Sequence, residues 1–169
     1  SRALGNEPRF VESPGGQSSR VTDEATIDAI QMVYRGRINN RIVARLQSLG
    51  CNAVGLSGVD GGLWKATRKD AIRIIEDGRK RILRGDKTGK IHTINTHLLH
   101  ILLDGGYRPV LTLPAFADEP VNVDGDRAAA AIAAALGAET LVILSDVPGV
   151  LAAFPDPQSL VERIPRAEL

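Results

Sequence analysis

The sequence predicts an α/β layered domain with a mainly parallel central sheet. Helical and strand patterns alternate along the 169 residues, in the order helix, strand, hairpin, helix, strand, helix, strand. The run T-L-V-I-L at residues 140–144 is apolar almost throughout, as is typical of a buried parallel strand. Polar clusters fall at predicted strand ends, at residues 57–62, 121–126 and 145–149. Because ligands of such sheets bind beyond the carboxyl ends of the strands, we expect the three clusters on one edge.

The composition is that of an ordinary globular protein, and the length fits one domain. Hydrophobic residues make up 43% and the net charge is +1, which argues against nucleic acid as the main partner. The single Cys51 excludes an internal disulfide and fits a reducing compartment, so we expect a cytoplasmic protein. No apolar run approaches the about 18 residues of a membrane helix, and residues 1–20 are polar. We therefore expect no membrane span and no signal peptide; the lack of an initiator Met suggests a processed or truncated chain.

The first predicted element after a loop at residues 1–19 is a long helix. Thr22 and Asp23 are capping residue types. Apolar residues then recur every three or four positions from Ile27 to Leu49, and Gly50 ends the pattern. The stripe is long and wide, which predicts a helix that serves a core and a subunit contact together.

Short strands and one further helix follow. In order, they are a strand at 53–56, a tight loop at 57–62, an outlying hairpin of strands 63–67 and 80–83, an extended piece at 91–94, a helix at 96–103 and a strand at 107–113.

The stretch at residues 121–136 joins an extended polar run to an alanine-rich helix. Asp124 and Asp126 stand two residues apart, just ahead of that helix. Either one of them is only the N-cap, or the pair belongs to a site; spacing alone leaves both open. Nine apolar residues follow Arg127, so we expect the helix to be buried in the core.

Other candidate residues also have two interpretations. The glycines of residues 57–62 let backbone approach a ligand or simply form a turn, and neither G-x-x-x-x-G-K-[ST] nor G-x-G-x-x-G is present. Asp146 can cap the turn before Gly149 or accept hydrogen bonds from a ribose. Arg20 can bind a carboxylate through its two-pronged guanidinium, or it is a solvated loop arginine.

Residues 65–90 carry ten Lys or Arg against four Asp or Glu, although the chain as a whole is balanced, with 21 against 20. Such a region is usually a solvated face, but the excess makes an acidic partner a live hypothesis. His92, His97 and His100 have no carboxylate at matching spacing, so no metal site is expected. Cys51 is expected to be a small buried side chain.

Six motifs occur in an order that resembles the amino acid kinase family, in its acetylglutamate kinase branch. They are S-R-V-T-D at 19–23, M-V-Y-R-G-R-I-N-N-R-I-V-A-R-L at 32–46, G-L-S-G-V-D-G-G at 55–62, R-P-V-L-T at 108–112, V-N-V-D-G-D-R-A-A at 121–129 and L-S-D-V-P-G-V at 144–150. The resemblance implies a three-layer sandwich and an ATP-dependent kinase that uses Mg²⁺ with the nucleotide.

Residue roles also follow from the resemblance. It implies that Arg20 binds a substrate carboxylate and that Asn122 holds the main-chain end of the same ligand. Asp126 matches the aspartate that orients the catalytic lysines, and Asp146 matches a residue that contacts the nucleotide, at its ribose. The helix near residues 26–49 is the one that forms the homodimer interface in this branch.

Within the branch, the D-G-D form of the acidic motif and the basic stretch at 67–90 resemble the archaeal members. Those kinases phosphorylate the side-chain carboxylate of aminoadipate or glutamate tethered to the acidic carrier protein LysW, in lysine and arginine biosynthesis. One alternative is an acetylglutamate kinase acting on free N-acetylglutamate. Another is a catalytically incomplete fragment that only binds substrate or dimerises.

By the resemblance, the family's first catalytic lysine lies on a K-x-G-G strand that, with an H-G-G-G loop, precedes the substrate arginine, and neither motif precedes Arg20. The second catalytic lysine lies in a carboxyl-terminal nucleotide lobe, after the point that Leu169 reaches. We therefore expect residues 1–169 to be one amino acid kinase domain truncated at both ends. It would hold mostly the acceptor-substrate half, with the nucleotide lobe starting near 140–169. The isolated chain is expected to have little or no activity, because electrostatic terms dominate phosphoryl transfer.

Overall fold

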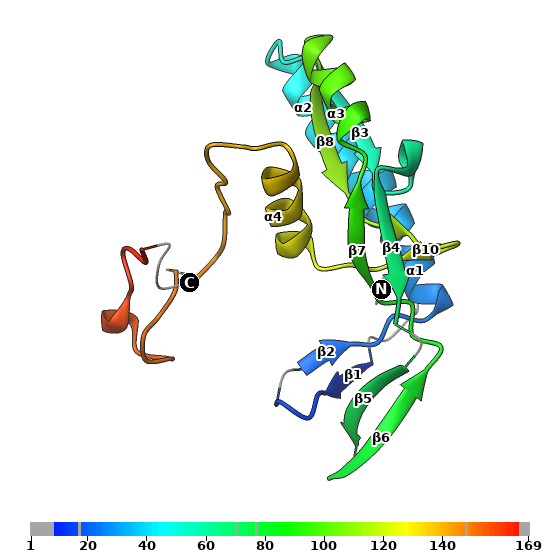
Figure 1. Ribbon diagram of the computed structural model, residues 1–169, viewed down its shortest axis with the longest axis vertical. Helices are drawn as coiled ribbons and strands as arrows, with labels where there is room; N and C mark the ends of the chain where they lie inside the picture. The colour runs from blue at the N-terminus through cyan, green and yellow to red at the C-terminus, as the bar shows by residue number, and fades with distance from the viewer. Residues whose placement is uncertain (1–8, 17, 70, 77, 148, 166–169) are drawn as a thin grey trace. The chain divides into compact units, whose positions relative to one another are not determined.

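The computed structural model describes residues 9–16, 18–69, 71–76, 78–147 and 149–165. The chain divides into two compact units, Ser1–Glu139 and Thr140–Leu169. The first unit contains all the named strands and the long helices (Figure 1). None of the helices in the described ranges is long and apolar enough to span a membrane.

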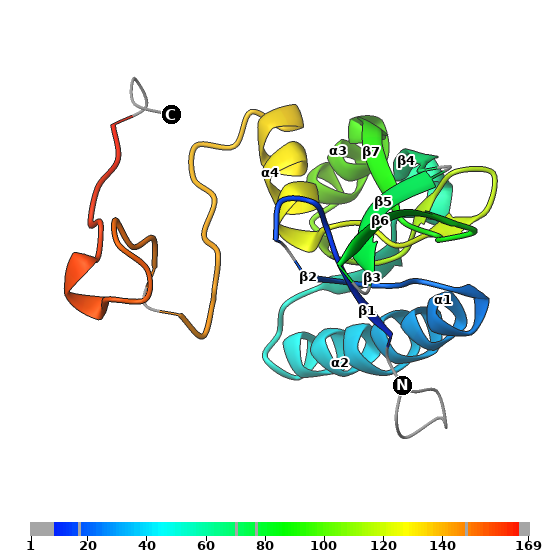
Figure 2. The ribbon, with the colours of Figure 1, turned by 90° about the horizontal axis from the view of Figure 1, so that it is seen from below.

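One continuous helical run follows the first strands, as the apolar stripe predicts. It consists of α1 (Glu24–Ile30), a π-helical segment η2 (Gln31–Asn39) and α2 (Asn40–Ser48). Asp23 caps it, because its carboxylate accepts a hydrogen bond from the Thr26 backbone N–H at 2.8 Å. Figure 2 shows α1 and α2 in one line along a side of the first unit. The π-helical turn is a local irregularity that a three-to-four spacing does not predict.

Three sheets make up the rest of the first unit, with the strand orders β2-β1-β5-β6, β10-β9-β4-β7 and β3-β8. The strands are β1 (Phe10–Glu12), β2 (Ser18–Arg20), β3 (Ala53–Ser57), β4 (Trp64–Arg68), β5 (Ala71–Glu76), β6 (Arg79–Arg84), β7 (Gly89–Ile94), β8 (Arg108–Thr112), β9 (Ala115–Phe116) and β10 (Pro120–Val121).

The α/β class is confirmed, but the sheets are mixed. The β3–β8 pair is parallel along all five residues, from Ala53 opposite Arg108 to Ser57 opposite Thr112. The single Lys65–Phe116 pair between β4 and β9 is also parallel. The other named strand pairs are antiparallel, because most of them are joined by short connections that reverse the chain.

The predicted hairpin of residues 63–67 with 80–83 is wrong. β6 pairs instead with β5, in register from Ala71 opposite Arg84 to Glu76 opposite Arg79. β4 pairs with β7 and β9 in another sheet. β5 and β6 are separated by only two residues, and strands that are adjacent in the chain usually pair with each other.

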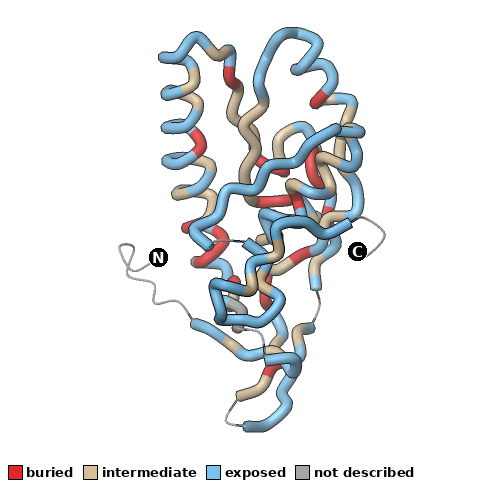
Figure 3. Tube along the Cα trace, turned by 90° about the vertical axis from the view of Figure 1, so that its left-hand side faces the viewer, coloured by how far each residue is buried: buried red, intermediate tan, exposed pale blue. Residues whose placement is uncertain are grey.

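The main core lies between the β4-containing sheet and two helices, α3 (Thr96–Asp104) and α4 (Gly125–Ala135). Its buried members are Leu63, Trp64, Ala66, Leu99, Ala115, Val121, Val123 and Ala128. The burial of α4 is less complete than its alanine-rich sequence predicts: Ala128 is its one buried residue, and Ala130, Ala134 and Ala135 are exposed. Figure 3 shows the same mixture along the chain, where buried residues form short stretches between longer exposed ones. Alanine favours a helix wherever it lies, so its abundance does not require burial.

The second unit contains a short 3₁₀ helix, η4 (Pro157–Ser159), and an isolated antiparallel bridge between Leu151 and Leu160. The strand predicted at residues 140–144 is not formed. Its apolar side chains are exposed, and Leu144 reaches 93%. A strand needs a hydrogen-bonded neighbour, and none of the described strands pairs with this segment.

Candidate functional site

Two of the predicted substrate motifs meet in the first unit. The Nδ2 group of Asn122 donates a hydrogen bond to Oγ1 of Thr22 at 3.1 Å. Thr22 lies two residues after Arg20 and is 0% exposed. The contact joins residues 100 positions apart and places the S-R-V-T-D and V-N-V-D-G-D motifs side by side. Arg20 itself is exposed at the end of strand β2.

A buried polar tripeptide, residues 86–88, connects both motifs. The Asp86 carboxylate accepts hydrogen bonds from the backbone N–H of Thr22 and of Thr88, both at 2.8 Å. The Lys87 N–H donates to the Thr22 carbonyl at 2.7 Å, and the Lys87 carbonyl accepts from the Asn122 N–H at 2.8 Å. Asp86 and Lys87 are only 3% and 8% exposed.

The Lys87 ammonium lies between two carboxylates from different elements. It contacts Glu24 in the first turn of α1 at 2.5 Å, and it also bonds to Glu119 in the turn between β9 and β10. Glu119 makes a second ion pair with Arg68 on β4 at 2.5 Å. The Lys87 ammonium donates hydrogen bonds to Glu119 and to Glu24, and these bonds raise the pKa of Lys87, while the bond accepted from Lys87 lowers the pKa of Glu119. Both groups are therefore held in their charged forms.

The two aspartates of the V-N-V-D-G-D motif differ: one caps a helix and the other has an exposed carboxylate. Asp124 is the N-cap of α4, since its Oδ1 accepts a hydrogen bond from the Arg127 N–H at 2.9 Å. Asp126 is exposed in the first turn of the helix. A hollow of about 450 Å³ opens beside them, lined by Lys69, Thr88, Gly89, Lys90, Ile91, Val123, Asp124, Arg127, Ala128 and Ala131. The N-cap interpretation thus holds for Asp124, and the role of Asp126 stays a prediction.

The loop at residues 57–62 is a turn fixed by its own contacts. The Asp60 carboxylate accepts hydrogen bonds from the Ser57 N–H and Oγ, at 2.6 and 2.9 Å. Burial would raise the pKa of Asp60, but these bonds and the Arg35 charge at 3.4 Å outweigh it and lower the pKa. A Cβ on Gly58 would come within 2.6 Å of the Trp64 ring. Glycine at position 58 therefore allows the turn to pack closely against Trp64.

Asp146 lies in the second unit and is exposed. The polar cluster at 145–149 follows a segment that is not a strand, so the expectation of three clusters at strand ends on one edge is wrong for this one. The clusters at 57–62 and 121–126 both belong to the first unit, after β3 and at β10.

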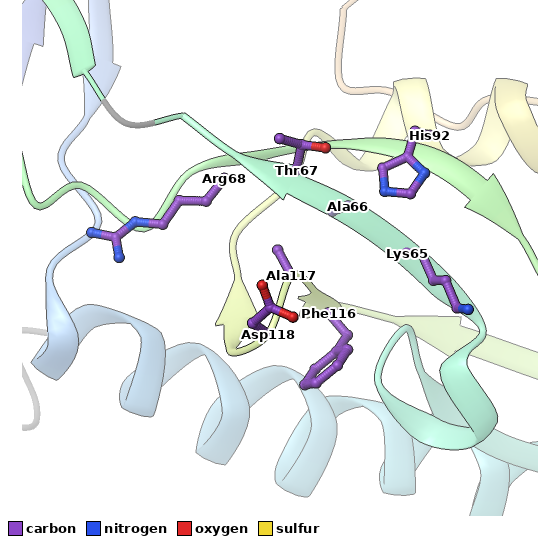
Figure 4. A pocket seen from close by; sticks show the side chains of 8 residues that line it. All are labelled: Lys65, Ala66, Thr67, Arg68, His92, Phe116, Ala117 and Asp118. Atoms are coloured by element: carbon purple, nitrogen blue, oxygen red, sulfur yellow. The ribbon is translucent and has the colours of Figure 1, made fainter.

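A second hollow, of about 570 Å³, lies beside β4. Its lining residues are Lys65, Ala66, Thr67, Arg68, His92, Phe116, Ala117 and Asp118 (Figure 4). Figure 4 shows Lys65 and Arg68 at opposite ends of β4, with Phe116 and Asp118 between them. The lining mixes cationic, acidic and aromatic groups, so its shape and charge favour no particular ligand.

Five of the ten basic residues of 65–90 lie on the β5–β6 hairpin and are exposed there: Arg73, Arg79, Lys80, Arg81 and Arg84. Arg81 pairs with Glu76 at 3.0 Å, and Arg9 pairs with the same carboxylate at 2.9 Å. The hairpin belongs to the sheet whose opposite edge is β2, the strand of Arg20. Among the residues that the structure describes, no group of three or more His, Cys, Asp or Glu could hold a metal ion. Cys51 is half-buried.

Comparison with known families extends the resemblance seen in the motifs. Residues 1–169 match the model of the amino acid kinase family. The chain belongs to the amino acid kinase family. The match covers both compact units, so the motifs at 144–150 fall within the family together with those of the first unit.

Curated members of this family are similar to the chain over nearly its whole length. The [LysW]-aminoadipate kinases of Thermus thermophilus and Deinococcus radiodurans are 50% and 53% identical over 98% of the chain. The acetylglutamate kinase of Methanopyrus kandleri is 46% identical over 95% of the chain. The chain spans 62%, 57% and 62% of the lengths of these three relatives.

Solved structures give the same family fold. The N-acetylglutamate synthase of Neisseria gonorrhoeae, complexed with coenzyme A and N-acetyl-glutamate, superposes with a TM-score of 0.66 at 25% identity. The superposition covers 89% of the chain and 32% of the synthase. The family assignment thus agrees with the fold.

The sequence does not predict three of the residues that connect the Thr22 segment with the Asn122 segment: Asp86, Lys87 and Glu119. Asp86 and Lys87 stand in the basic stretch, where charged residues usually indicate a solvated face. Glu119 is one acidic residue in a loop. Only the run R-G-D-K-T-G-K, which places an acidic residue between cations before a strand, could have drawn attention to this position.

Proposed function

We propose that the protein acts as a carboxylate kinase. ATP gives its γ-phosphoryl group to the side-chain carboxylate of carrier-bound α-aminoadipate or glutamate. The bond from the γ-phosphorus to the ADP oxygen breaks as a carboxylate oxygen bonds to that phosphorus, which gives an acyl phosphate and ADP. This step would serve lysine or arginine biosynthesis in the cytoplasm.

The observation that carries the proposal is the hydrogen bond between Asn122 and Thr22, which joins the two acceptor motifs. Arg20, two residues away, would bind a carboxylate of the acceptor, and Asn122 would hold its main-chain end. Positioning of this kind is the main contribution that a kinase makes to phosphoryl transfer, besides charge neutralisation. The names of the two relatives from Thermus thermophilus and Deinococcus radiodurans favour the carrier-bound acceptor.

The nucleotide would be contacted by Asp146, at the ribose. Mg²⁺ would come with the ATP phosphates, because such ions are usually held by phosphates and one or two carboxylates. The exposed carboxylate of Asp126 is proposed to orient the catalytic lysines that the family resemblance implies.

The carrier, an acidic protein of the LysW type, is proposed to dock on the β5–β6 hairpin. The exposed cations Arg79, Lys80 and Arg81 lie on the edge strand of the sheet that also contains Arg20. A carrier on this hairpin could therefore present its tethered amino acid along one sheet. Charge reversal of the three residues to Glu should weaken carrier binding by about tenfold or more, and added salt should weaken binding to the unaltered protein.

Calorimetry with aminoadipate linked to the carrier measures this binding whether or not turnover occurs. A single Lys80→Glu change can be matched with Arg108→Glu, an equal charge change at the exposed first residue of β8 in another sheet. The Arg108 variant should bind the carrier normally. Unchanged affinity in the triple variant would remove the docking proposal, although the kinase proposal would stand.

An acetylglutamate kinase is the second candidate, favoured by the similarity to the Methanopyrus kandleri enzyme. Full-efficiency phosphorylation of free N-acetylglutamate would select it. A non-catalytic module would instead bind acceptor with no phosphorylation, even when ATP is present.

A homodimer through the long helix is also proposed. Exposed apolar side chains follow its outer face, including Met32, Ile38 and Ile42, and a shallow hollow of about 380 Å³ lies along α2. Ile42→Glu should convert a dimer into a monomer in analytical ultracentrifugation, because a buried charge without a partner is costly. A dimer of unchanged stability in this variant would exclude the helix as the interface.

A further inference from the structure

The buried tripeptide 86–88 has no part in the reaction proposed above, yet it contacts both acceptor segments. Its backbone bonds on one side reach Thr22, next to the Arg20 strand, and on the other side reach Asn122. Its two charged side chains are almost fully buried. A loop between two strands needs neither feature to reverse the chain, so an additional role is indicated.

We propose that Asp86 and Lys87 are positioning residues that hold the Arg20 segment and the Asn122 segment at a fixed separation, so that both can bind one acceptor molecule. The inference rests on the proposed function, and it concerns how the acceptor site is assembled.

The Asp86 carboxylate suits this role through its two oxygens. Oδ2 accepts from the Thr22 N–H, and Oδ1 accepts from the Thr88 N–H. An ionised carboxylate only accepts hydrogen bonds, so both donors are satisfied. An asparagine at this position has the same shape but must point its NH₂ group at one of the two N–H donors. That substitution would therefore release either Thr22 or Thr88.

Lys87 connects the Arg20 segment with the Asn122 segment through both its backbone and its side chain. Its N–H and carbonyl bond to Thr22 and Asn122, and these backbone bonds place one residue between the two acceptor segments. Its ammonium joins Glu24 on α1 to Glu119 beside β10. The helix that follows Arg20 and the strand that precedes Asn122 are thereby held to the same side chain.

The experiment is calorimetric titration of the folded protein with carrier-linked aminoadipate and, separately, with N-acetylglutamate. Asp86→Asn should weaken acceptor binding by about tenfold, the effect of losing one buried hydrogen bond at the site. The affinity for carrier without amino acid should stay unchanged, because the β5–β6 hairpin is intact. A weakening that is equal for loaded and unloaded carrier would overturn the inference.

A double-mutant cycle separates positioning from simple destabilisation. If Asp86 acts through the Asn122 segment, Asp86→Asn should cost much less affinity in an Asn122→Ala background than alone. Additive losses would contradict this. Leu99→Ala is the control: it removes core packing in α3, so it should lower the melting temperature while the folded protein binds acceptor normally.

If Asp86→Asn does not fold, Glu119→Gln takes its place in the cycle with the same expectation. It removes one of the two carboxylates that hold the Lys87 ammonium and leaves the exposed Glu24 in place. Failure of the unaltered protein to bind either acceptor is a different result: it would reject the proposed function itself, and with it the positioning role.

Discussion

Residues 86–88 and residues 140–144 differ in a way that their polarity does not predict: the charged segment is buried and the apolar segment is exposed. The first segment is charged, but it is buried among hydrogen-bond and ion-pair partners from α1, β4 and the β9–β10 turn. The second is apolar, yet it is exposed in a unit whose described residues form one isolated bridge, between Leu151 and Leu160. The difference shows that available partners decide burial. A charge can be buried when every polar atom is paired, and an apolar run stays exposed when no surface covers it.

The largest expected effect comes from a matched pair of leucines. Leu99 is 1% exposed in the core of the first unit, whereas Leu144 is almost fully exposed. Leu99→Ala should lower the free energy of unfolding by about 2–5 kcal/mol, because it removes buried contacts and leaves a cavity. Leu144→Ala should change it by less than about 0.5 kcal/mol.

Chemical denaturation followed by the fluorescence of Trp64, the single tryptophan, measures both changes. Trp64 packs in the same core cluster as Leu99, so its signal reports on the first unit. An equal loss of unfolding free energy in the two variants would contradict the contrast between the buried and the exposed segment. It would mean that Leu144 is packed against a surface in solution.

Much of the fold could be predicted from the sequence because its signals are local. The long helix, the strand before Ser57, the helix closed by Gly105 and the strand before Pro114 all appear where periodicity and breakers place them. Pairing partners could not be predicted in the same way. Residues 71–76 and 80–83 form the hairpin because they are adjacent in the chain, and periodicity alone does not specify which strands bond to each other.

The candidate site could be predicted only where a motif marks it. Motif order predicts Arg20, Asn122, Asp126 and Asp146 as site residues, and their roles stay predictions; the structure brings the segments of the first two together through Thr22. Asp86 and Lys87 were missed because nothing in a sequence distinguishes a buried, fully paired charge from a solvated one. Their burial depends on Glu119, 32 residues away from Lys87, and on Thr22, 64 residues away from Asp86.

The charges around residues 86–88 are expected to have a smaller effect on the free energy of unfolding, and this effect depends on pH. The Lys87 hydrogen bond and the charges of Lys87 and Arg68 lower the pKa of Glu119 below its ordinary value of 4.5. This carboxylate therefore stabilises the fold at pH values above 4.5, and the contribution is lost as the pH falls through the lowered pKa. Lys87 behaves in the opposite sense: its pKa is raised above 10.5, so its contribution is complete below pH 10.5 and is lost as the pH rises through the folded-state value.

Glu119→Gln should accordingly flatten the acid limb of the stability curve between about pH 5 and pH 2, without abolishing it, because Asp23 and Asp60 also have lowered pKa values. The measurement is the free energy of unfolding at several pH values, and Leu144→Ala, which removes no titratable group, should keep the slope of the unaltered protein. An unchanged slope in Glu119→Gln would mean that the Lys87–Glu119 pair does not form in solution. The tripeptide would then be held by its backbone bonds alone, and the contrast with residues 140–144 would rest on hydrogen bonding without charge.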